Sequence, residues 1–192
     1  KRVWQAIVRS KIASQWSLLQ ALQLDASDGE ALVTQVRSGD PENVEAAAAS
    51  RYWKRLFGPD FRRDREAPDQ NRLLNYGYTV LRSSTARAIC AVGLHPGLGV
   101  HHHNQYSAFC LADDLMEPYR PIVDRAVHAL ASREGNAVEM TKAVRGELIA
   151  SLLGRFVVRG ESRTLFDLIA RSASSLARVL TGETRELELW VP

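Results

Sequence analysis

The chain has 192 residues, of which 45% are hydrophobic and 24% charged, a composition typical of a globular domain and not of a disordered chain. Its 25 basic and 22 acidic side chains leave a formal net charge of +3, which neither identifies nor excludes a nucleic-acid partner. The cysteines, Cys90 and Cys110, lack the CxxC spacing of a four-thiolate zinc site and cannot form a disulfide framework. We expect both to be buried, reduced thiols in the cytoplasm.

No run of residues approaches the roughly 18 apolar positions that a membrane span needs, so the sequence predicts no membrane segment. The chain starts at Lys1 with neither an initiator methionine nor the pattern of a signal peptide. We expect it to be part of a longer protein whose beginning is missing.

Apolar residues recur every three or four positions through most of the chain, which predicts a mainly α-helical fold. The chain is interpreted as one helical catalytic domain with entry helices (1–39), a metal-site core (40–135), and C-terminal helices with a tail (136–192). The predicted helices cover approximately residues 4–22, 27–39, 40–57, 69–93, 111–130, 138–153 and 164–180.

Several local signals set these helix boundaries. Ser27 and Glu30 resemble a capping box, and Asp40-Pro41 resembles an N-cap followed by proline at the first helical position. Two prolines and mixed charges predict a surface loop over 58–69. Prolines 118 and 121 should interrupt the helix over 111–130. The alternating residues 187–191 predict a strand or an ordered arm.

The densest polar cluster combines His101–His103 with Asp113, Asp114 and Glu117. On a helix, Asp113 and Glu117 are four residues apart and share a face, where like charges repel. A divalent cation would remove that repulsion, and imidazole with carboxylates suits Mn²⁺ or Mg²⁺. The sequence also allows a simpler interpretation, because acids early in a helix are favoured by its dipole and Arg120 is placed to pair with Glu117.

Glu45 lies in the first predicted turn of the helix that follows Asp40, where a carboxylate is favourable without any function. Its neighbours Ala46–Ala49 are small, so another backbone could approach that surface closely.

Basic and aromatic residues flank these elements and suit a phosphate backbone and stacked bases. Aromatic residues at helical spacing are more often core, which is our expectation for Trp53, Phe57 and Tyr78. The candidate DNA contacts are Arg51, Tyr76, Arg82 and Arg87.

Four segments, in this order and spacing, resemble the family of CRISPR-associated integrases, the catalytic subunits of spacer acquisition. They are PENVEAAAASRYW (41–53), NYGY (75–78), GLHPGLGVHH (93–102) and DLMEPYRP (114–121), and WQAIVRSKI (4–12) resembles the first helix of that family's catalytic domain. The histidine-rich loop is most similar to members from type II systems.

The resemblance implies an all-α catalytic domain, preceded in the family by a smaller β domain that this chain lacks. It places the ligands of a Mg²⁺ or Mn²⁺ ion on Glu45, His102 and Glu117, which are then also the catalytic residues. Asp114 matches an acidic position beside the site, with Asp113 next to it. The helix of Glu45 should therefore lie against the helix of Glu117.

The implied activity is a metal-dependent endonuclease and integrase. The 3′-hydroxyl of a captured DNA attacks a phosphodiester of the CRISPR repeat, and the broken strand leaves. The implied partners are double-stranded DNA with single-stranded 3′ ends, repeat DNA, a second copy of the chain, and a small ferredoxin-like companion subunit. Removing the Glu117 carboxylate should then abolish strand transfer and leave folding intact, because it relieves like-charge repulsion.

Two other functions remain open on the residues alone. A helical metal-dependent phosphohydrolase also uses His and Asp on helices, but it usually needs an adjacent His-Asp pair, which this sequence lacks. A non-catalytic helical module that binds DNA or protein would use the acidic residues as helix caps and would be indifferent to Mn²⁺ and to a chelator.

Overall fold

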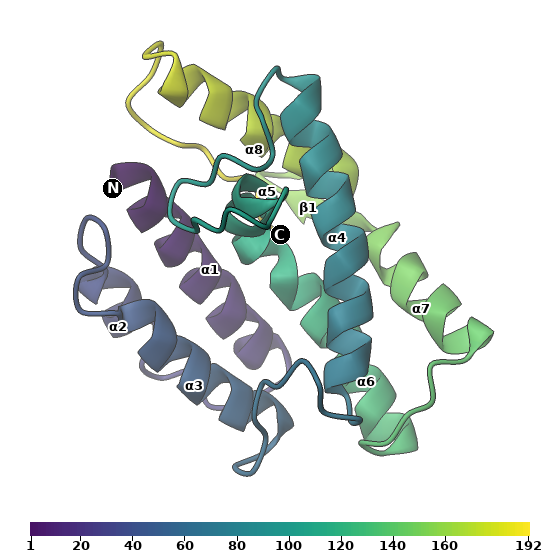
Figure 1. Ribbon diagram of the computed structural model, residues 1–192. Coiled ribbons are helices and arrows are strands. Elements are labelled where there is room, and N and C mark those ends of the chain that lie inside the picture. The colour runs from purple at the N-terminus through teal and green to yellow at the C-terminus, as the bar shows by residue number, and fades with distance from the viewer.

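Eight α-helices, one 3₁₀ turn (η1) and one β-hairpin make up the fold, and the computed structural model describes all residues, 1–192 (Figure 1). The elements are α1 (Arg2–Ala21), α2 (Gly29–Gln35), α3 (Val44–Phe57), α4 (Asn71–Ala91), α5 (Cys110–Met116), η1 (Glu117–Tyr119), α6 (Arg120–Glu134), α7 (Lys142–Leu152), β1 (Arg155–Val158), β2 (Glu161–Thr164) and α8 (Leu165–Leu180). The mainly helical fold is therefore confirmed. The structure contains no helix with the length and apolarity of a membrane span.

Helix α1 lies at the centre of the fold, with α2 and α3 on one side and α5, η1 and α6 on the other (Figure 1). Its apolar stripe is fully buried at Ile7, Ile12 and Leu19, as its sequence periodicity predicts. A second apolar cluster joins α4, α6, α7 and α8. The candidate active site lies where the helices around α1 meet this second cluster.

The predicted helices are present, and the predicted break at the prolines is confirmed. Pro118 lies in η1 and Pro121 in the first turn of α6, so α5 and α6 are separate helices joined by a 3₁₀ turn that contains Glu117. The loop over 58–69 is also confirmed.

The predicted starts of α2 and α3 are wrong in detail. Ser27 bonds to Asp25 instead of capping α2, and α3 begins at Val44, three residues after Pro41. Asp40 still caps α3 from a distance, because its carboxylate accepts hydrogen bonds from the backbone N–H groups of Val44 and Glu45, each at 3.0 Å. This contact fixes the first turn of α3 and with it the position of Glu45.

The β-hairpin was not predicted. β1 and β2 are four residues each, pair antiparallel and carry charged residues, so they lack a distinctive alternating pattern. The C-terminal segment is an ordered arm, not a strand: the Trp190 N–H donates to Ser172 Oγ at 2.9 Å.

Two smaller expectations about burial need correction. Cys90 is exposed, whereas Cys110 is buried. Tyr78 is a core residue, but Trp53 and Phe57 are only partly buried and pack at the edges of the apolar clusters.

A buried carboxylate joins three helices beneath the site. Asp124 of α6 accepts hydrogen bonds from Tyr52 of α3, at 2.7 Å, and from Tyr78 of α4. The contact between α4 and α6 is tight because Gly77 faces Val123, and a Cβ at residue 77 would lie 2.4 Å from its Cγ1 atom. Burial raises the pKa of Asp124 to about 7, although both phenol groups and Arg120 favour its ionised form.

We predict that Asp124 makes stability decrease with pH. Its folded-state pKa lies above the ordinary value, so the stability that the protonated acid contributes is complete below about pH 4 and is lost as pH rises towards 7. Urea denaturation at pH 4, 5.5 and 7 measures the free energy of unfolding of both proteins. As pH rises, the value for wild type should fall relative to the value for Asp124→Asn. Parallel stability curves for the two proteins would contradict this.

Candidate active site

Two of the three predicted ligands, Glu45 and Glu117, meet at a single cation, which is the ammonium group of Lys11. Lys11 Nζ lies 2.5 Å from Glu45 Oε1 and 2.6 Å from Glu117 Oε2. Arg120 binds the other oxygen of Glu117 at 2.7 Å. The carboxylates come from α3 and η1, and the lysine from α1, so three elements distant in sequence form one charged cluster.

Burial makes these charges interact strongly. The side chains of Lys11 and Glu117 are 9% and 4% exposed. Burial would raise the pKa of the Glu117 carboxyl, but the charges of Arg120 and Lys11 outweigh it and hold this pKa below its usual value. Burial would likewise lower the pKa of Lys11, but the charges of Glu117 and Glu45 raise it. Glu117 and Lys11 are therefore both charged at neutral pH.

His102 lies beside this cluster and is held by Asp114. Its Nδ1 atom is 2.5 Å from Asp114 Oδ1. The hydrogen bond to Asp114 is the main cause of a raised His102 pKa, and the charges of Glu117 and Glu45 add to it. In the neutral imidazole, this contact assigns the proton to Nδ1 and leaves Nε2 as the free electron-pair donor.

Asp114 also shapes the loop that carries His102. The carboxylate is fully buried and accepts hydrogen bonds from the backbone N–H groups of Val100, His101 and His102 at 2.6–3.3 Å. The loop approaches so closely at Gly99 that a Cβ there would lie 2.2 Å from the His102 carbonyl oxygen.

Trp4 of α1 supports the histidines of this loop from beneath. The ring of His101 stacks on it with centroids 4.1 Å apart, and the ring of His102 meets it edge-on. His103 is exposed and makes no such contact.

The donor set suits a divalent cation, but its present arrangement includes the lysine. Two carboxylates and a neutral imidazole are N and O ligands of the kind that Mn²⁺ accepts, and Glu117 Oε2 is buried with an ion pair but no hydrogen bond. No group of three or more His, Cys, Asp or Glu side chains is arranged to hold a metal as the structure stands. A divalent ion between the glutamates would therefore take the place of the Lys11 ammonium.

The expected contact between the helices of Glu45 and Glu117 needs correction. Helix α1 packs against both α3 and η1, and it brings Lys11 between the two glutamates. α3 contacts α6, the helix that follows Glu117, through the hydrogen bond from Tyr52 to Asp124 and through the rings of Phe57 and His128.

Sequence reasoning missed Lys11, although a signal was present. Lys11 occupies the same buried stripe of α1 as Ile7, four residues earlier, and Gln15, four residues later. A lysine on an apolar stripe needs a buried anion as its partner. The expected ion pair of Arg120 with Glu117 is present.

The predicted DNA contacts have different surroundings. Arg51 is bound to Asp28 at 2.9 Å, in a cluster that fixes α2 against α3, and Tyr76 packs partly buried against the core. Arg82 pairs with Asp113 at 2.6 Å. Arg87 is exposed and lies over the Phe166 ring. Asp113 thus contacts Arg82 and not the glutamate pair.

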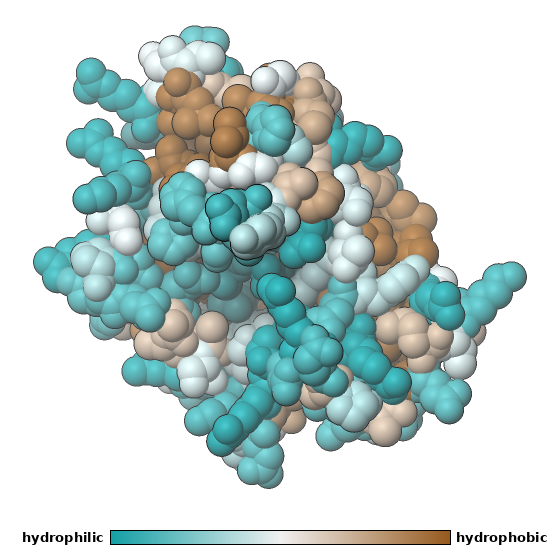
Figure 2. Space-filling model, viewed as in Figure 1, coloured by the Kyte–Doolittle hydropathy of each residue, from teal (hydrophilic) through white to brown (hydrophobic).

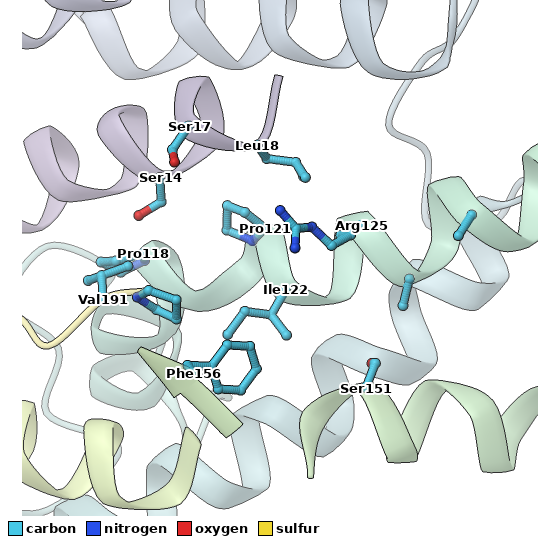
Figure 3. Close-up of a pocket in the computed structure, with 13 residues that line it drawn as sticks. Ser14, Ser17, Leu18, Pro118, Pro121, Ile122, Arg125, Ser151, Phe156 and Val191 are labelled. Atoms are coloured by element: carbon cyan, nitrogen blue, oxygen red, sulfur yellow. The ribbon is translucent and has the colours of Figure 1, made fainter. Parts of the chain in front are cut away.

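A separate cavity of about 480 Å³ lies between α1, α6, β1 and the C-terminal arm (Figure 3). Serine hydroxyls and apolar side chains line it, and Arg125 is its only charged residue. None of its side chains is a carboxylate or an imidazole, so it lacks the side chains that the chemistry at Glu45 and Glu117 requires.

Comparison with known proteins shows the family to which the chain belongs. Residues 2–149 match the family model described as CRISPR associated protein Cas1. The chain belongs to the Cas1 family. This match contains Lys11, Glu45, His102 and Glu117.

Curated relatives support the same family. The chain is 36% identical over 193 residues to the CRISPR-associated endonuclease Cas1 of Neisseria meningitidis, and the match covers 98% of this chain and 63% of that protein. It is 37% identical over 143 residues to a CRISPR-associated endonuclease Cas1 of Pyrobaculum aerophilum, covering 71% of this chain and 47% of that protein. The chain therefore spans less than two thirds of the length of either relative.

Solved structures share the fold. A casposase bound to integration product aligns with a TM-score of 0.79 at 24% identity, covering 97% of this chain and 62% of that chain. A Cas1 protein from Thermotoga maritima aligns with a TM-score of 0.77 at 17% identity, covering 94% and 65%. At these identities the likeness establishes the helical fold of this Cas1 chain.

We predict that Asp114→Asn lowers the pKa of His102 towards its ordinary value of 6.5, because a neutral amide replaces the negative charge that stabilises the imidazolium at Nδ1. An NMR titration of the imidazole carbons measures this. His128, whose pKa is lowered by burial, should be unchanged and serves as the internal control. An unchanged His102 titration would show that Asp114 does not set its protonation.

We predict that Lys11→Met destabilises the fold by about 3–5 kcal/mol, because the variant leaves Glu45 and Glu117 close together without their shared cation. Urea denaturation at neutral pH measures the loss. The matched control is Lys54→Met on α3, which removes an exposed lysine without an ion pair and should change stability by about 0.5 kcal/mol or less. Equal effects of both variants would contradict a special role for Lys11.

Proposed function

We propose that this Cas1 chain is the metal-dependent catalytic part of an integrase and endonuclease of CRISPR adaptation. The observation that carries the proposal is the convergence of Glu45 and Glu117, from separate elements, on one buried cation with His102 beside them. Carboxylates that only cap helices would not need to meet in the interior. The proposed reaction joins the 3′-hydroxyl of a captured DNA to the CRISPR repeat by exchange of one phosphodiester for another.

Glu45, His102 and Glu117 would hold Mg²⁺ or Mn²⁺. When bound, such an ion polarises a phosphoryl oxygen and stabilises the leaving oxygen. The two glutamates bring the negative charge that balances the ion, and Asp114 presents His102 with Nε2 unprotonated. Arg120 keeps one oxygen of Glu117 engaged, at 2.7 Å, and so orients the carboxylate.

The proposed partners are double-stranded DNA with single-stranded 3′ ends, repeat DNA, a second copy of the chain, and a small ferredoxin-like companion subunit. Support comes from proteins with the same fold: one is described as a casposase bound to integration product, and another belongs to a Cas6-RT-Cas1–Cas2 complex that aligns over 98% of this chain and 24% of that one with a TM-score of 0.75.

The structure changes which variant tests the catalytic role best. Glu117→Ala was expected to leave folding intact, but Glu117 is balanced by Lys11 and Arg120, so alanine would leave Arg120 without its anion and Lys11 with Glu45 alone. Glu117→Gln keeps the shape of the side chain and removes the charge that a metal needs.

We predict that Glu45→Gln, His102→Ala and Glu117→Gln each reduce strand transfer by at least about 100-fold, since even a residue that only supports a metal ligand contributes about 10- to 100-fold. The assay follows labelled DNA joined to a repeat-containing duplex in Mn²⁺, in Mg²⁺ and in chelator, with thermal melts to establish folding. Glu134→Gln, at an exposed carboxylate paired with Arg133, is the control. DNA joining that persists in chelator would contradict the proposal, and metal-independent DNA binding without joining would favour a binding module.

A further inference from the structure

Lys11 occupies the position between the two glutamates that a divalent ion would need. Its Nζ atom lies 2.5 Å from Glu45 Oε1 and 2.6 Å from Glu117 Oε2. Arg120 binds the other oxygen of Glu117, at 2.7 Å, and has no contact of this kind with Glu45. An ammonium group and a divalent ion cannot share the space between the same two oxygens, because their charges repel each other.

The contact between Lys11 and Glu117 is close but incomplete. Lys11 donates a hydrogen bond to Glu45, whereas Glu117 Oε2 is buried and accepts no hydrogen bond although the ammonium group is 2.6 Å away. The lysine therefore balances the charge of Glu117 without satisfying the hydrogen-bonding capacity of this oxygen. The oxygen remains suited to a cation of another kind.

A second acceptor for the ammonium group is present on α1 itself. Gln15 is four residues after Lys11, so the two side chains are neighbours on one face of the helix. Gln15 is 3% exposed, and its Oε1 atom is buried without a hydrogen-bond partner. A buried acceptor without a donor is costly, and the ammonium group of Lys11 would satisfy it.

The cluster is open to solvent on the side of Glu45. The Glu45 side chain is 22% exposed, against 9% for Lys11, and hydrophilic side chains cover the middle of this face of the molecule, between α1 and α4 (Figures 1 and 2). Lysine carries its charge on a flexible four-carbon stem. The ammonium group can therefore change partners while α1 keeps its place against α3 and η1.

We propose that Lys11 is an exchangeable counter-ion that competes with the divalent ion for Glu45 and Glu117. Lys11 neutralises the glutamates when no ion is bound, and it transfers to Gln15 when an ion binds. The inference rests on the proposed function and deepens it, because it names a residue that sets how tightly the ion is held. Affinity for the ion is lowered by the contact that stabilises the metal-free cluster.

Mn²⁺ binding by Lys11→Met measures the competition. Isothermal titration calorimetry gives the affinity of the full chain for Mn²⁺ without any reaction taking place. If Lys11 has left the glutamates in one tenth of the molecules or fewer, the variant should bind Mn²⁺ at least about tenfold more tightly than wild type. Unchanged or weaker binding would overturn the proposal, because Lys11 would then support the ion instead of competing with it.

Arg120→Gln is the matched control for charge. It removes one positive charge from the same glutamate, but not from the space between Glu45 and Glu117. This variant should not tighten Mn²⁺ binding. Equal gains in Arg120→Gln and Lys11→Met would overturn the exchange, because they would indicate only the loss of a nearby positive charge. Thermal melts in chelator establish that each variant is folded.

Gln15→Met tests the second position and does not depend on the stability of Lys11→Met. The change removes a buried polar group that has no partner, so the variant should fold. It should weaken Mn²⁺ binding about threefold or more, because the released ammonium group loses its acceptor. In the Lys11→Met background the same change should have no effect. Unchanged Mn²⁺ binding in Gln15→Met, or equal losses in both backgrounds, would overturn the exchange.

A measurement on wild type follows Lys11 directly. The chain has four lysines, at positions 1, 11, 54 and 142, and only Lys11 is buried. In protein labelled with ¹³C at lysine Cε, the diamagnetic ion Mg²⁺ should shift the NMR signal of Lys11 and leave that of Lys54 unchanged. A Lys11 signal that does not move while calorimetry shows Mg²⁺ bound would contradict the exchange.

These outcomes separate the exchange from the proposed function. If Glu117→Gln abolishes strand transfer and Lys11→Met binds Mn²⁺ no more tightly than wild type, the exchange fails and the proposed function stands. If Lys11→Met binds Mn²⁺ more tightly but wild type does not join DNA in Mn²⁺, the proposed function fails and the exchange remains. If neither protein binds Mn²⁺, both are wrong.

Discussion

The shared contact of Glu45 and Glu117 with Lys11 is the interaction on which the rest of this structure depends. Two ionised carboxylates shielded from water, 4% exposed at Glu117 and 22% at Glu45, need a cation between them, because desolvation and repulsion both oppose their charge. The surrounding elements are arranged to satisfy that condition: Asp40 fixes the start of α3, the prolines separate α5 from α6 at η1, and α1 delivers the lysine between them. The same requirement for positive charge makes the cluster a candidate for a divalent ion.

A second layer of buried polar groups keeps this cluster in place. Asp124 joins Tyr52 and Tyr78 and so ties α3, α4 and α6 together. The Asp114 carboxylate forms hydrogen bonds with the backbone of the histidine loop and with the imidazole of His102. Each of these carboxylates is fully buried, and each has its oxygens occupied by donors from other elements. Such networks are costly when incomplete, so they specify one arrangement of the helices.

The arginines of the chain differ in whether a carboxylate pairs with them. Arg51 and Arg55 are bound to Asp28 and hold α2 against α3, whereas Arg63 and Arg65 line a cavity and form no ion pair. The net charge of the chain is only +3, so affinity for a polyanion depends on where unpaired charges gather, not on their total. Two such arginines, Arg63 and Arg65, share a cavity with Arg120, the partner of Glu117.

The sequence by itself determined the helices, the proline break before α6, the family, and the identity of Glu45, His102 and Glu117 as the residues to examine. Helical periodicity and proline act over a few neighbouring residues, and the family motifs are contiguous, so both can be recognised from the linear sequence. Only the tertiary structure decided that Lys11 lies between the glutamates, that Arg51 is held by Asp28, and that Arg63 and Arg65 share a cavity with Arg120. Lys11 and Glu45 are 34 residues apart, and no local pattern specifies which buried charges meet when helices pack.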